Sequence, residues 1–205
     1  MSKSPPRLVK VFDPVLRLTH WWIVLSIMSL VTTSQLAELL EHGPREVVLW
    51  EWHIVSGYAL TAGLAMRVIW GLIGPATARW SDLWHPSAWA GLLRLHWPAV
   101  RRGHDVAASL VFLLFYGLVA VMLITGFGLS ATEFATGPLA SIFDGTGRFE
   151  WLFEEPHEVG FVLTLVFISV HLGALVFHQL RGERVAQAMV TGEQCLAKDS
   201  GAGHE

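Results

Sequence analysis

Ten histidines stand out in this 205-residue chain, because five of them fall within long apolar stretches of the sequence. A polar imidazole in an apolar environment needs a partner, and a bound metal ion is a partner that also gives it a function. For any single ring, a hydrogen-bonded contact between helices is the alternative. The five are His20, His53, His157, His171 and His178. The others fall in connections or in the tail, where a solvated ring is expected: His42, His85, His96, His104 and His204.

His157 and His171 are fourteen residues apart, a spacing that places them within about 40° of the same helical face. The helical rise over that interval is about 21 Å. Two irons held at these heights would lie one near each leaflet of a bilayer. This spacing therefore predicts two stacked haems that could carry electrons across a membrane.

Each of these rings needs a second imidazole at a matching depth on a neighbouring helix. His53 opens another apolar stretch just after acidic and aromatic residues, as His157 does, so we expect these two to form the outer pair. His20 lies on the side toward which His171 descends, and we expect those two to form the inner pair. His178, seven residues further on, would also fit the inner position. Two axial imidazoles leave no open position on a haem iron, which favours electron transfer over oxygen binding.

Arg67 is the one basic residue that we place inside an apolar stretch, and it follows His53 by fourteen residues. It should therefore share a helical face with His53 but lie near the inner haem. A buried arginine needs an anion or a polar acceptor, which a haem propionate or a quinone carbonyl would supply. The alternative is that its side chain extends to the headgroups.

The elements that must position these residues are four long apolar stretches. The chain is 53% hydrophobic and only 15% charged, which is too apolar for a soluble domain of this length. Lipid offers the backbone no hydrogen-bond partner, so each stretch should be a helix. The sequence predicts an all-α integral membrane four-helix bundle, one di-haem domain over residues 1–192, with spans at about residues 18–37, 53–73, 106–132 and 157–180.

The 14 Lys and Arg residues set the expected orientation. Eleven belong to the N-terminal arm, the second connection and the C-terminal tail, two to the other connections, and Arg67 lies within a span. By the positive-inside rule both termini should be cytoplasmic. Residues 87–97, after Pro86, have an apolar face and are expected to form a short helix on the cytoplasmic surface. Residues 193–205 are expected to be a disordered tail.

Cysteine content limits the cofactor chemistry. Cys195 is the single cysteine, so no internal disulfide and no Cys-x-x-Cys-His motif can form. Covalent c-type haem and iron–sulfur centres are excluded on this basis. The N-terminus has no small-residue cleavage site before the apolar run, so we expect the first helix to be retained.

Several motifs together resemble one family. The opening motif consists of Val11, Phe12, Asp13 and Pro14, followed by Arg17, Leu18, Thr19, His20 and Trp21. The likeness continues at His53, Gly57, residues 67–71, Gly74, residues 78–80, Gly103, His104, Thr125, Gly126, residues 155–158, His171 and residues 188–192. On these residues the chain resembles bacterial cytochrome b561 proteins, particularly the b-type cytochrome subunits of nickel–iron hydrogenases. One departure is Asp105, where an asparagine is expected after Gly-His.

The resemblance implies four helices, two bis-histidine haems b, and electron exchange between a quinone pool and a redox partner. Its ligands map onto His20, His53, His157 and His171, which selects His171 over His178. Arg67 and Arg17 are included as expected cofactor-binding residues.

We therefore expect the electron-transfer subunit of an oxidoreductase complex in the bacterial inner membrane. Its expected partners are membrane lipid, quinone, and a periplasmic dehydrogenase, hydrogenase or cytochrome c. A self-contained superoxide:quinone oxidoreductase of the same fold and a haem-free transporter or anchor are the alternatives. The net charge of −3 gives no indication of nucleic-acid binding.

The outer connections and helix ends are strongly acidic, and a negative surface there would attract a positively charged redox protein. A well-solvated pair of loops is the alternative interpretation. The acidic residues are Glu38, Glu41, Glu46, Glu51, Glu133, Asp144, Glu150, Glu154, Glu155 and Glu158, against Arg45 and Arg148.

Overall fold

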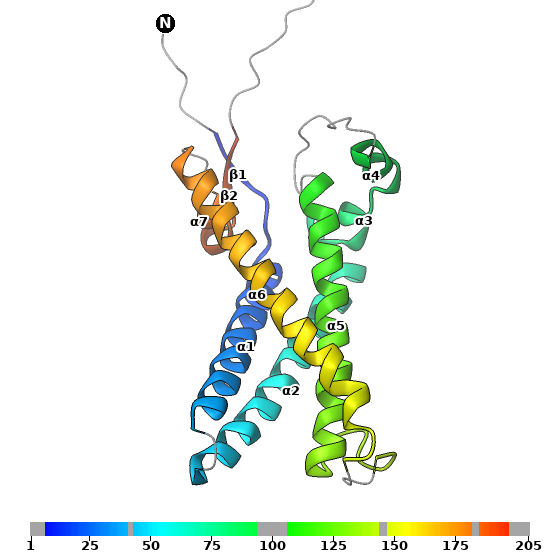
Figure 1. The fold of residues 1–205 in the computed structure, drawn as a ribbon. Helices are drawn as coiled ribbons and strands as arrows, with labels where there is room; N and C mark the ends of the chain where they lie inside the picture. Colours follow the sequence, from blue (N-terminus) through cyan, green and yellow to red (C-terminus); the bar gives the residue numbers. More distant parts are fainter. Residues whose placement is uncertain (1–6, 41–42, 94–105, 144–146, 182–184, 197–205) are drawn as a thin grey trace, which may run out of the picture.

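The computed structural model describes residues 7–40, 43–93, 106–143, 147–181 and 185–196. Four long helices dominate it (Figure 1). They are α1 (Pro14–Leu39), α2 (Pro44–Ile73), α5 (Val106–Phe134) and α6 (Glu150–Leu180). Within the described residues these are also the helices long and apolar enough to cross a membrane, with α5 contributing Ser109–Phe134. The expected multi-pass helical architecture is confirmed.

The shorter elements lie at one end of the bundle, which we call the strand end (Figure 1). They are β1 (Arg7–Lys10), η1 (Ala76–Ala78), α3 (Trp80–Leu83), α4 (Pro86–Leu93), α7 (Val185–Thr191) and β2 (Glu193–Leu196). The opposite end, where α2 and α6 begin, we call the loop end. Because helices that cross a bilayer alternate in direction, α1 and α5 run from the strand end and α2 and α6 run toward it.

Two predictions about short segments are confirmed only in part. The tail expected to be disordered from residue 193 instead begins as strand β2, which pairs antiparallel with β1 so that Lys10 faces Glu193. Backbone pairing with the N-terminal arm supplies the order that composition alone did not indicate. Residues 197–205 lie outside the described residues. The helix expected over residues 87–97 is observed up to Leu93 as α4. Residues 94–97 lie outside the described residues.

Helices α1, α2 and α6 begin several residues before the apolar stretches predicted for them, whereas α5 begins at Val106 as expected. At the start of α1, the Asp13 carboxylate accepts hydrogen bonds from the backbone N–H groups of Val15 and Leu16, each at 3.0 Å. Pro14 and Pro44 occupy the first turns of α1 and α2, where a missing N–H group costs nothing. Charged residues such as Glu46 are therefore accommodated in helical turns that precede the apolar stretch.

Large apolar side chains cover the outside of the bundle. Leu25, Ile124 and Val166 are more than half exposed, at 67%, 60% and 54%. In water such a surface would associate, whereas in a bilayer it is solvated by lipid tails. The outer surface therefore agrees with the membrane assignment made from length and composition.

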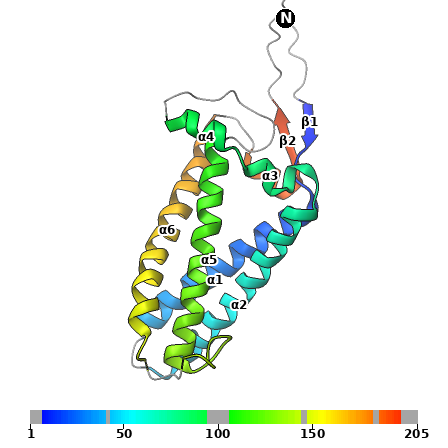
Figure 2. The ribbon, with the colours of Figure 1, turned by 90° about the vertical axis from the view of Figure 1, so that its right-hand side faces the viewer.

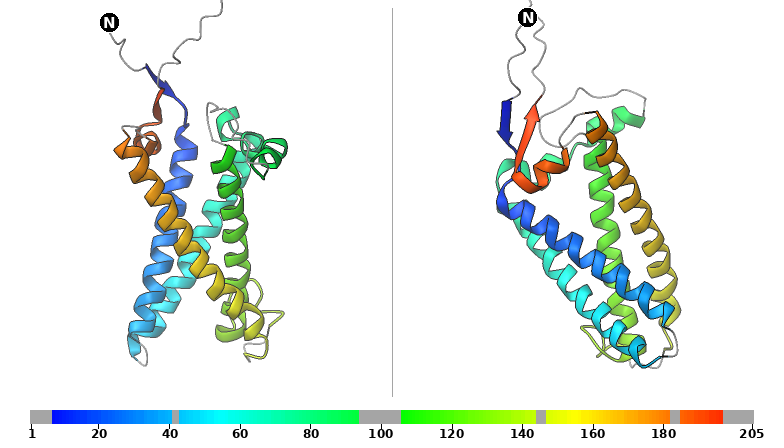
Figure 3. Two further views of the ribbon diagram at one scale, coloured as in Figure 1. Left: turned by 45° about the horizontal axis from the view of Figure 1, so that its top comes forward. Right: turned by 90° about the vertical axis from the view of Figure 1, so that its left-hand side faces the viewer.

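The four helices form two hairpins. Helix α1 packs along α2 and α5 along α6, whereas between the hairpins the backbones approach mainly where α2 meets α5. Figure 2 shows the hairpins close together at the loop end and apart toward the strand end, whereas Figure 1 and the left view of Figure 3 show them apart at the loop end, so the two hairpins cross each other. An apolar core of Ile23, Ile27, Leu60 and Val119 joins them at mid-height.

Tryptophans pack into grooves left by glycines on α2. The Trp22 indole N–H donates to the Ala59 carbonyl at 2.7 Å, and a Cβ atom at Gly63 would lie only 2.6 Å from that ring. Trp80 lies against Gly71 in the same way and donates to the Val68 carbonyl at 3.2 Å. These indoles fix α1 and α3 against α2, in addition to any preference for the membrane interface.

We expect Gly71→Ala to lower the free energy of unfolding by about 1–3 kcal/mol, because the new methyl group would overlap the Trp80 indole. Gly117→Ala is the matched control, since a Cβ atom there meets nothing within 4 Å. Thermal denaturation of both variants in detergent measures the effect. Equal melting temperatures for the two variants would show that Trp80 does not depend on the groove.

Candidate functional site

His53 on α2 and His157 on α6 face each other across the space between the hairpins. Their ring centroids are 6.5 Å apart and the ring planes are inclined at 70°. Both residues lie near the loop end, because α2 and α6 begin there. The structure thus brings together the two rings that the sequence assigned to the outer pair.

This separation fits two axial imidazoles on one iron. A bond from a metal ion to an imidazole nitrogen is about 2 Å long, so two rings on opposite sides of an ion have centroids roughly 6.3 Å apart. No group of three or more histidine, cysteine, aspartate or glutamate side chains converges on a common point among the described residues. Two protein ligands match an iron whose four other ligands come from a porphyrin.

Both rings present the nitrogen that a metal needs. His53 Nδ1 lies 3.1 Å from the Leu30 carbonyl oxygen and 3.2 Å from Thr33 Oγ1. His157 Nδ1 lies 2.8 Å from Thr125 Oγ1. With Nδ1 occupied by these contacts on neighbouring helices, Nε2 is the nitrogen available for ligation.

Open space for a planar group adjoins His53. Gly57 follows it by one helical turn and therefore lies on the same face of α2. A Cβ atom at Gly57 would meet nothing within 4 Å. The donor set, the ring separation and this space all fit a haem b between α2 and α6.

His20 on α1 and His171 on α6 form a looser pair. They interact electrostatically, but no ring contact joins them among the described residues. Trp21 lies edge-on to the His20 ring, with centroids 5.6 Å apart.

Aromatic side chains surround His171. The Phe167 ring, one turn earlier on α6, is parallel to the imidazole with centroids 5.9 Å apart, and Phe112 of α5 approaches edge-on at 6.2 Å. Phe167 also stacks on Phe115, at 3.7 Å between centroids and 11° between planes. These rings hold the His171 imidazole by packing on two sides.

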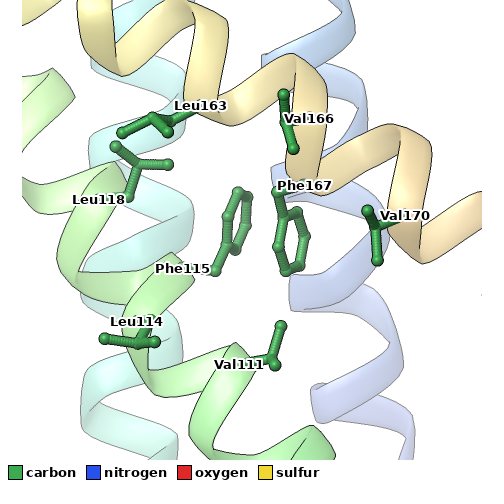
Figure 4. A pocket seen from close by; sticks show the side chains of 8 residues that line it. All are labelled: Val111, Leu114, Phe115, Leu118, Leu163, Val166, Phe167 and Val170. Atoms are coloured by element: carbon green, nitrogen blue, oxygen red, sulfur yellow. The ribbon is translucent and has the colours of Figure 1, made fainter.

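The stacked phenylalanines form part of an apolar hollow of about 310 Å³ between α5 and α6, with the two rings parallel at its centre (Figure 4). Its lining is entirely aliphatic and aromatic: Val111, Leu114, Phe115, Leu118, Leu163, Val166, Phe167 and Val170. Because Phe167 lies between His157 and His171 along α6, the hollow occupies the interval between the two histidine levels.

Arg67 is buried within the protein, with only 4% of its surface exposed, so its side chain does not extend to the headgroups. Its Nε donates to the Tyr116 hydroxyl at 3.1 Å and an Nη donates to the Ala78 carbonyl at 3.0 Å. The Trp80 ring centroid lies 4.5 Å from the guanidinium carbon, within cation–π range. Tyr116 is one turn from Phe112 on α5, which places Arg67 near the level of His171.

Arg17 links the start of α1 to the C-terminal segment. Its guanidinium donates to the Val190 carbonyl, and a Cβ atom at Gly192 would lie 3.4 Å from it. Its Nε is buried and finds no hydrogen-bond partner among the described residues. Arg17 precedes His20 by three residues and so shares its side of α1. An unpartnered buried donor at this position fits an acidic group of a bound ligand.

Sequence reasoning missed a contact between the opening motif and α2. Asp13, which caps α1, also accepts a hydrogen bond from the Trp70 indole N–H at 3.0 Å. Nothing in the spacing of these residues indicated it, because they are far apart in sequence and on antiparallel helices. The contact fixes the height of α1, and therefore of His20, relative to α2.

The remaining expected residues lie elsewhere. His178, on the last turn of α6, lies beside Phe177 at 5.9 Å between ring centroids. Glu133 at the end of α5 interacts electrostatically with Glu150 and Glu154 at the start of α6, so part of the acidic set does gather at the loop end. Outside the described residues lie His42, His96, His104, His204, Glu41, Asp105 and Asp144.

Comparison with known proteins places the chain in a cytochrome family. The sequence profile of prokaryotic cytochrome b561 matches residues 11–192. Three relatives are each named as a probable Ni/Fe-hydrogenase B-type cytochrome subunit. That of Azotobacter vinelandii is 27% identical over 93% of this chain and 90% of its own length. That of Azotobacter chroococcum is 29% identical over 80% and 78%. That of Bradyrhizobium diazoefficiens is 23% identical over 91% and 85%.

No solved structure gives a significant match to this chain. The profile match extends from the opening motif to the end of α7, and it includes both histidine pairs. The chain therefore belongs to the prokaryotic cytochrome b561 family, whose members are multi-pass membrane proteins that hold haem b and transfer electrons.

Proposed function

We propose that the protein holds two haems b, one between His53 and His157 and one between His20 and His171, and relays electrons across the membrane. The approach of His53 and His157 across the two hairpins is the observation that carries the proposal. When bound, each haem supplies an iron that accepts and releases one electron. Helix α6 provides one ligand at each level, which fixes the separation along the helix at about 21 Å.

Charged side chains near the strand end support the second site. The unpartnered Nε of Arg17 is available to a propionate of the inner haem. Arg67 is already held by Tyr116, Ala78 and Trp80, so it contributes a fixed positive charge near that level. A fixed positive charge favours the reduced form of a nearby cofactor.

The proposed partners follow from the relatives and from the distribution of charge. The relatives' names point to a hydrogenase as redox partner. We place this partner on the periplasmic side of the bacterial inner membrane. Quinone would accept or supply electrons at the other end. The excess of Lys and Arg around the strand end supports a cytoplasmic position for both termini and for α4.

We expect His53→Ala or His157→Ala to remove the outer haem, and His20→Ala or His171→Ala to remove the inner one. Loss of either imidazole destroys a six-coordinate site. His178→Ala is the matched control, a histidine of the same helix that should leave both haems in place. Pyridine haemochrome assays with reduced-minus-oxidised spectra count the haems. Loss of haem from His178→Ala alone would contradict the pairing, and wild-type protein without b-type bands would contradict the proposal itself.

Arg67→Leu should lower the midpoint potential of the inner haem, by roughly 60 mV if the charge contributes a tenfold shift. The outer haem serves as the internal reference in the same redox titration. Because two hydrogen bonds are also lost, the variant should be less stable. If both potentials stay at their wild-type values, Arg67 has only a structural role.

The acidic loop end predicts that exchange with a soluble cationic partner depends on salt. The Debye length falls from about 30 Å at 0.01 M to about 8 Å at 0.15 M, so the exchange rate should fall on the order of tenfold or more. Combined replacement of Glu150, Glu154 and Glu155 by glutamine should imitate high salt. Stopped-flow kinetics with a basic cytochrome c measures both effects. A rate that responds to neither would favour a permanent membrane complex.

A further inference from the structure

We infer that Thr33 and Thr125 are positioning residues of the His53–His157 pair. Each hydroxyl, joined at His53 by the Leu30 carbonyl, holds one imidazole with a proton on Nδ1, so that the lone pair of Nε2 would be available to an iron. The inference rests on the proposed function, since it assigns these threonines a role toward the outer haem. It adds two residues from α1 and α5, helices that contribute no ligand to this site.

The protonation of His53 follows from its acceptors. The Leu30 carbonyl oxygen, 3.1 Å from Nδ1, can only accept, so the hydrogen must be on Nδ1. Thr33 Oγ1 lies 3.2 Å from the same nitrogen. The Thr33 hydroxyl hydrogen is directed to the carbonyls of Ser29 at 2.8 Å and Leu30 at 3.1 Å. Its oxygen is therefore free to accept from the ring.

His157 has the same environment, built from the other hairpin. Thr125 Oγ1 lies 2.8 Å from Nδ1. The Thr125 hydroxyl hydrogen is directed to the carbonyls of Val121 at 2.9 Å and Met122 at 3.1 Å. Its oxygen therefore also accepts from the imidazole. Gly126 lets the ring approach, since a Cβ atom there would lie 3.3 Å from His157 Cε1.

The two environments repeat one pattern. In each, a threonine on the first helix of a hairpin bonds its own helix three and four residues back and accepts from a histidine on the second helix. The inner pair lacks this arrangement: within the described part of the chain, neither His20 nor His171 forms a side-chain hydrogen bond. The pattern therefore distinguishes the outer site and is not a general property of histidines in this bundle.

The arrangement has a chemical consequence at the iron. An acceptor on Nδ1–H increases the electron density at Nε2 and makes the imidazole a stronger ligand. A stronger donor favours the more highly charged ferric state. Removing one acceptor should therefore raise the midpoint potential of the outer haem.

The test compares Thr33→Val and Thr125→Val, which remove the hydroxyl at nearly constant volume, with Thr33→Ser and Thr125→Ser, which retain it. Thr164→Val is the matched control, because Thr164 on α6 makes the same bond to its own helix, at 2.8 Å to the Gly160 carbonyl, without a histidine partner. Redox titration of the purified full chain follows both haems, and the His20–His171 haem is the internal reference.

Each valine variant should shift the outer haem's equilibrium toward the reduced state roughly tenfold, about 59 mV for a one-electron couple. The serine variants and Thr164→Val should keep the wild-type potential. If a valine variant instead loses the outer haem, retention of that haem by the matching serine variant supports the role, and loss from both variants overturns it.

Two further outcomes separate this inference from the proposed function. Wild-type potentials in both valine variants, or equal shifts of both haems, would overturn the role of the threonines and leave the haem sites intact. Wild-type protein with fewer than two b-type haems would instead contradict the proposed function.

Discussion

The approach of His53 and His157 is the interaction on which the rest of the structure depends. The two hairpins share little backbone contact, and lipid tails provide no hydrophobic force that would draw them together. Their relative position is fixed by the mid-height core around Ile23 and Val119, by the Arg67–Tyr116 hydrogen bond and by the pairing of β1 with β2. A group bound between the facing rings would add to these contacts. A centroid separation of 6.5 Å leaves room for one iron with an imidazole on each side. In this arrangement a haem would act as a structural bridge between the hairpins as well as a redox centre.

Helix α6 carries one histidine of each proposed haem site. One face of this helix carries His157 and His171, while α2 and α1 each contribute one partner. Between the two levels, aromatic and aliphatic side chains of α5 and α6 line an apolar hollow, in which Phe115 and Phe167 are stacked in parallel. An apolar interval keeps water away from both sites and lowers the local dielectric response. The fixed charges of Arg67 and of the acidic loop end then act on the two levels differently.

The two levels also differ in how their ligands are held. At the loop end, two threonine hydroxyls and the Leu30 carbonyl contact the Nδ1 atoms, whereas at the strand end packing against Phe112 and Phe167 orients His171. Asp13 and Arg17 contribute to the strand end indirectly, by joining α1 to Trp70 and to the C-terminal segment. This distribution of contacts provides two chemically distinct environments for the two proposed bis-histidine sites.

The sequence by itself determined the four helices, the candidate ligands and the family. A helix that spans a bilayer needs a long run of apolar residues, which can be recognised in the sequence. The α-helical periodicity places His157 and His171 on one face. It also led us to pair His53 with His157, since both open a span at the same end. Only the tertiary structure decided that Arg67 is buried under Trp80, that Asp13 bonds Trp70, that Glu193–Leu196 pairs with the N-terminal arm, and that Thr33 and Thr125 reach the histidines. These contacts join residues on different helices or distant segments. Their formation depends on the rotation and height of each helix relative to its neighbours, which periodicity along one helix does not specify.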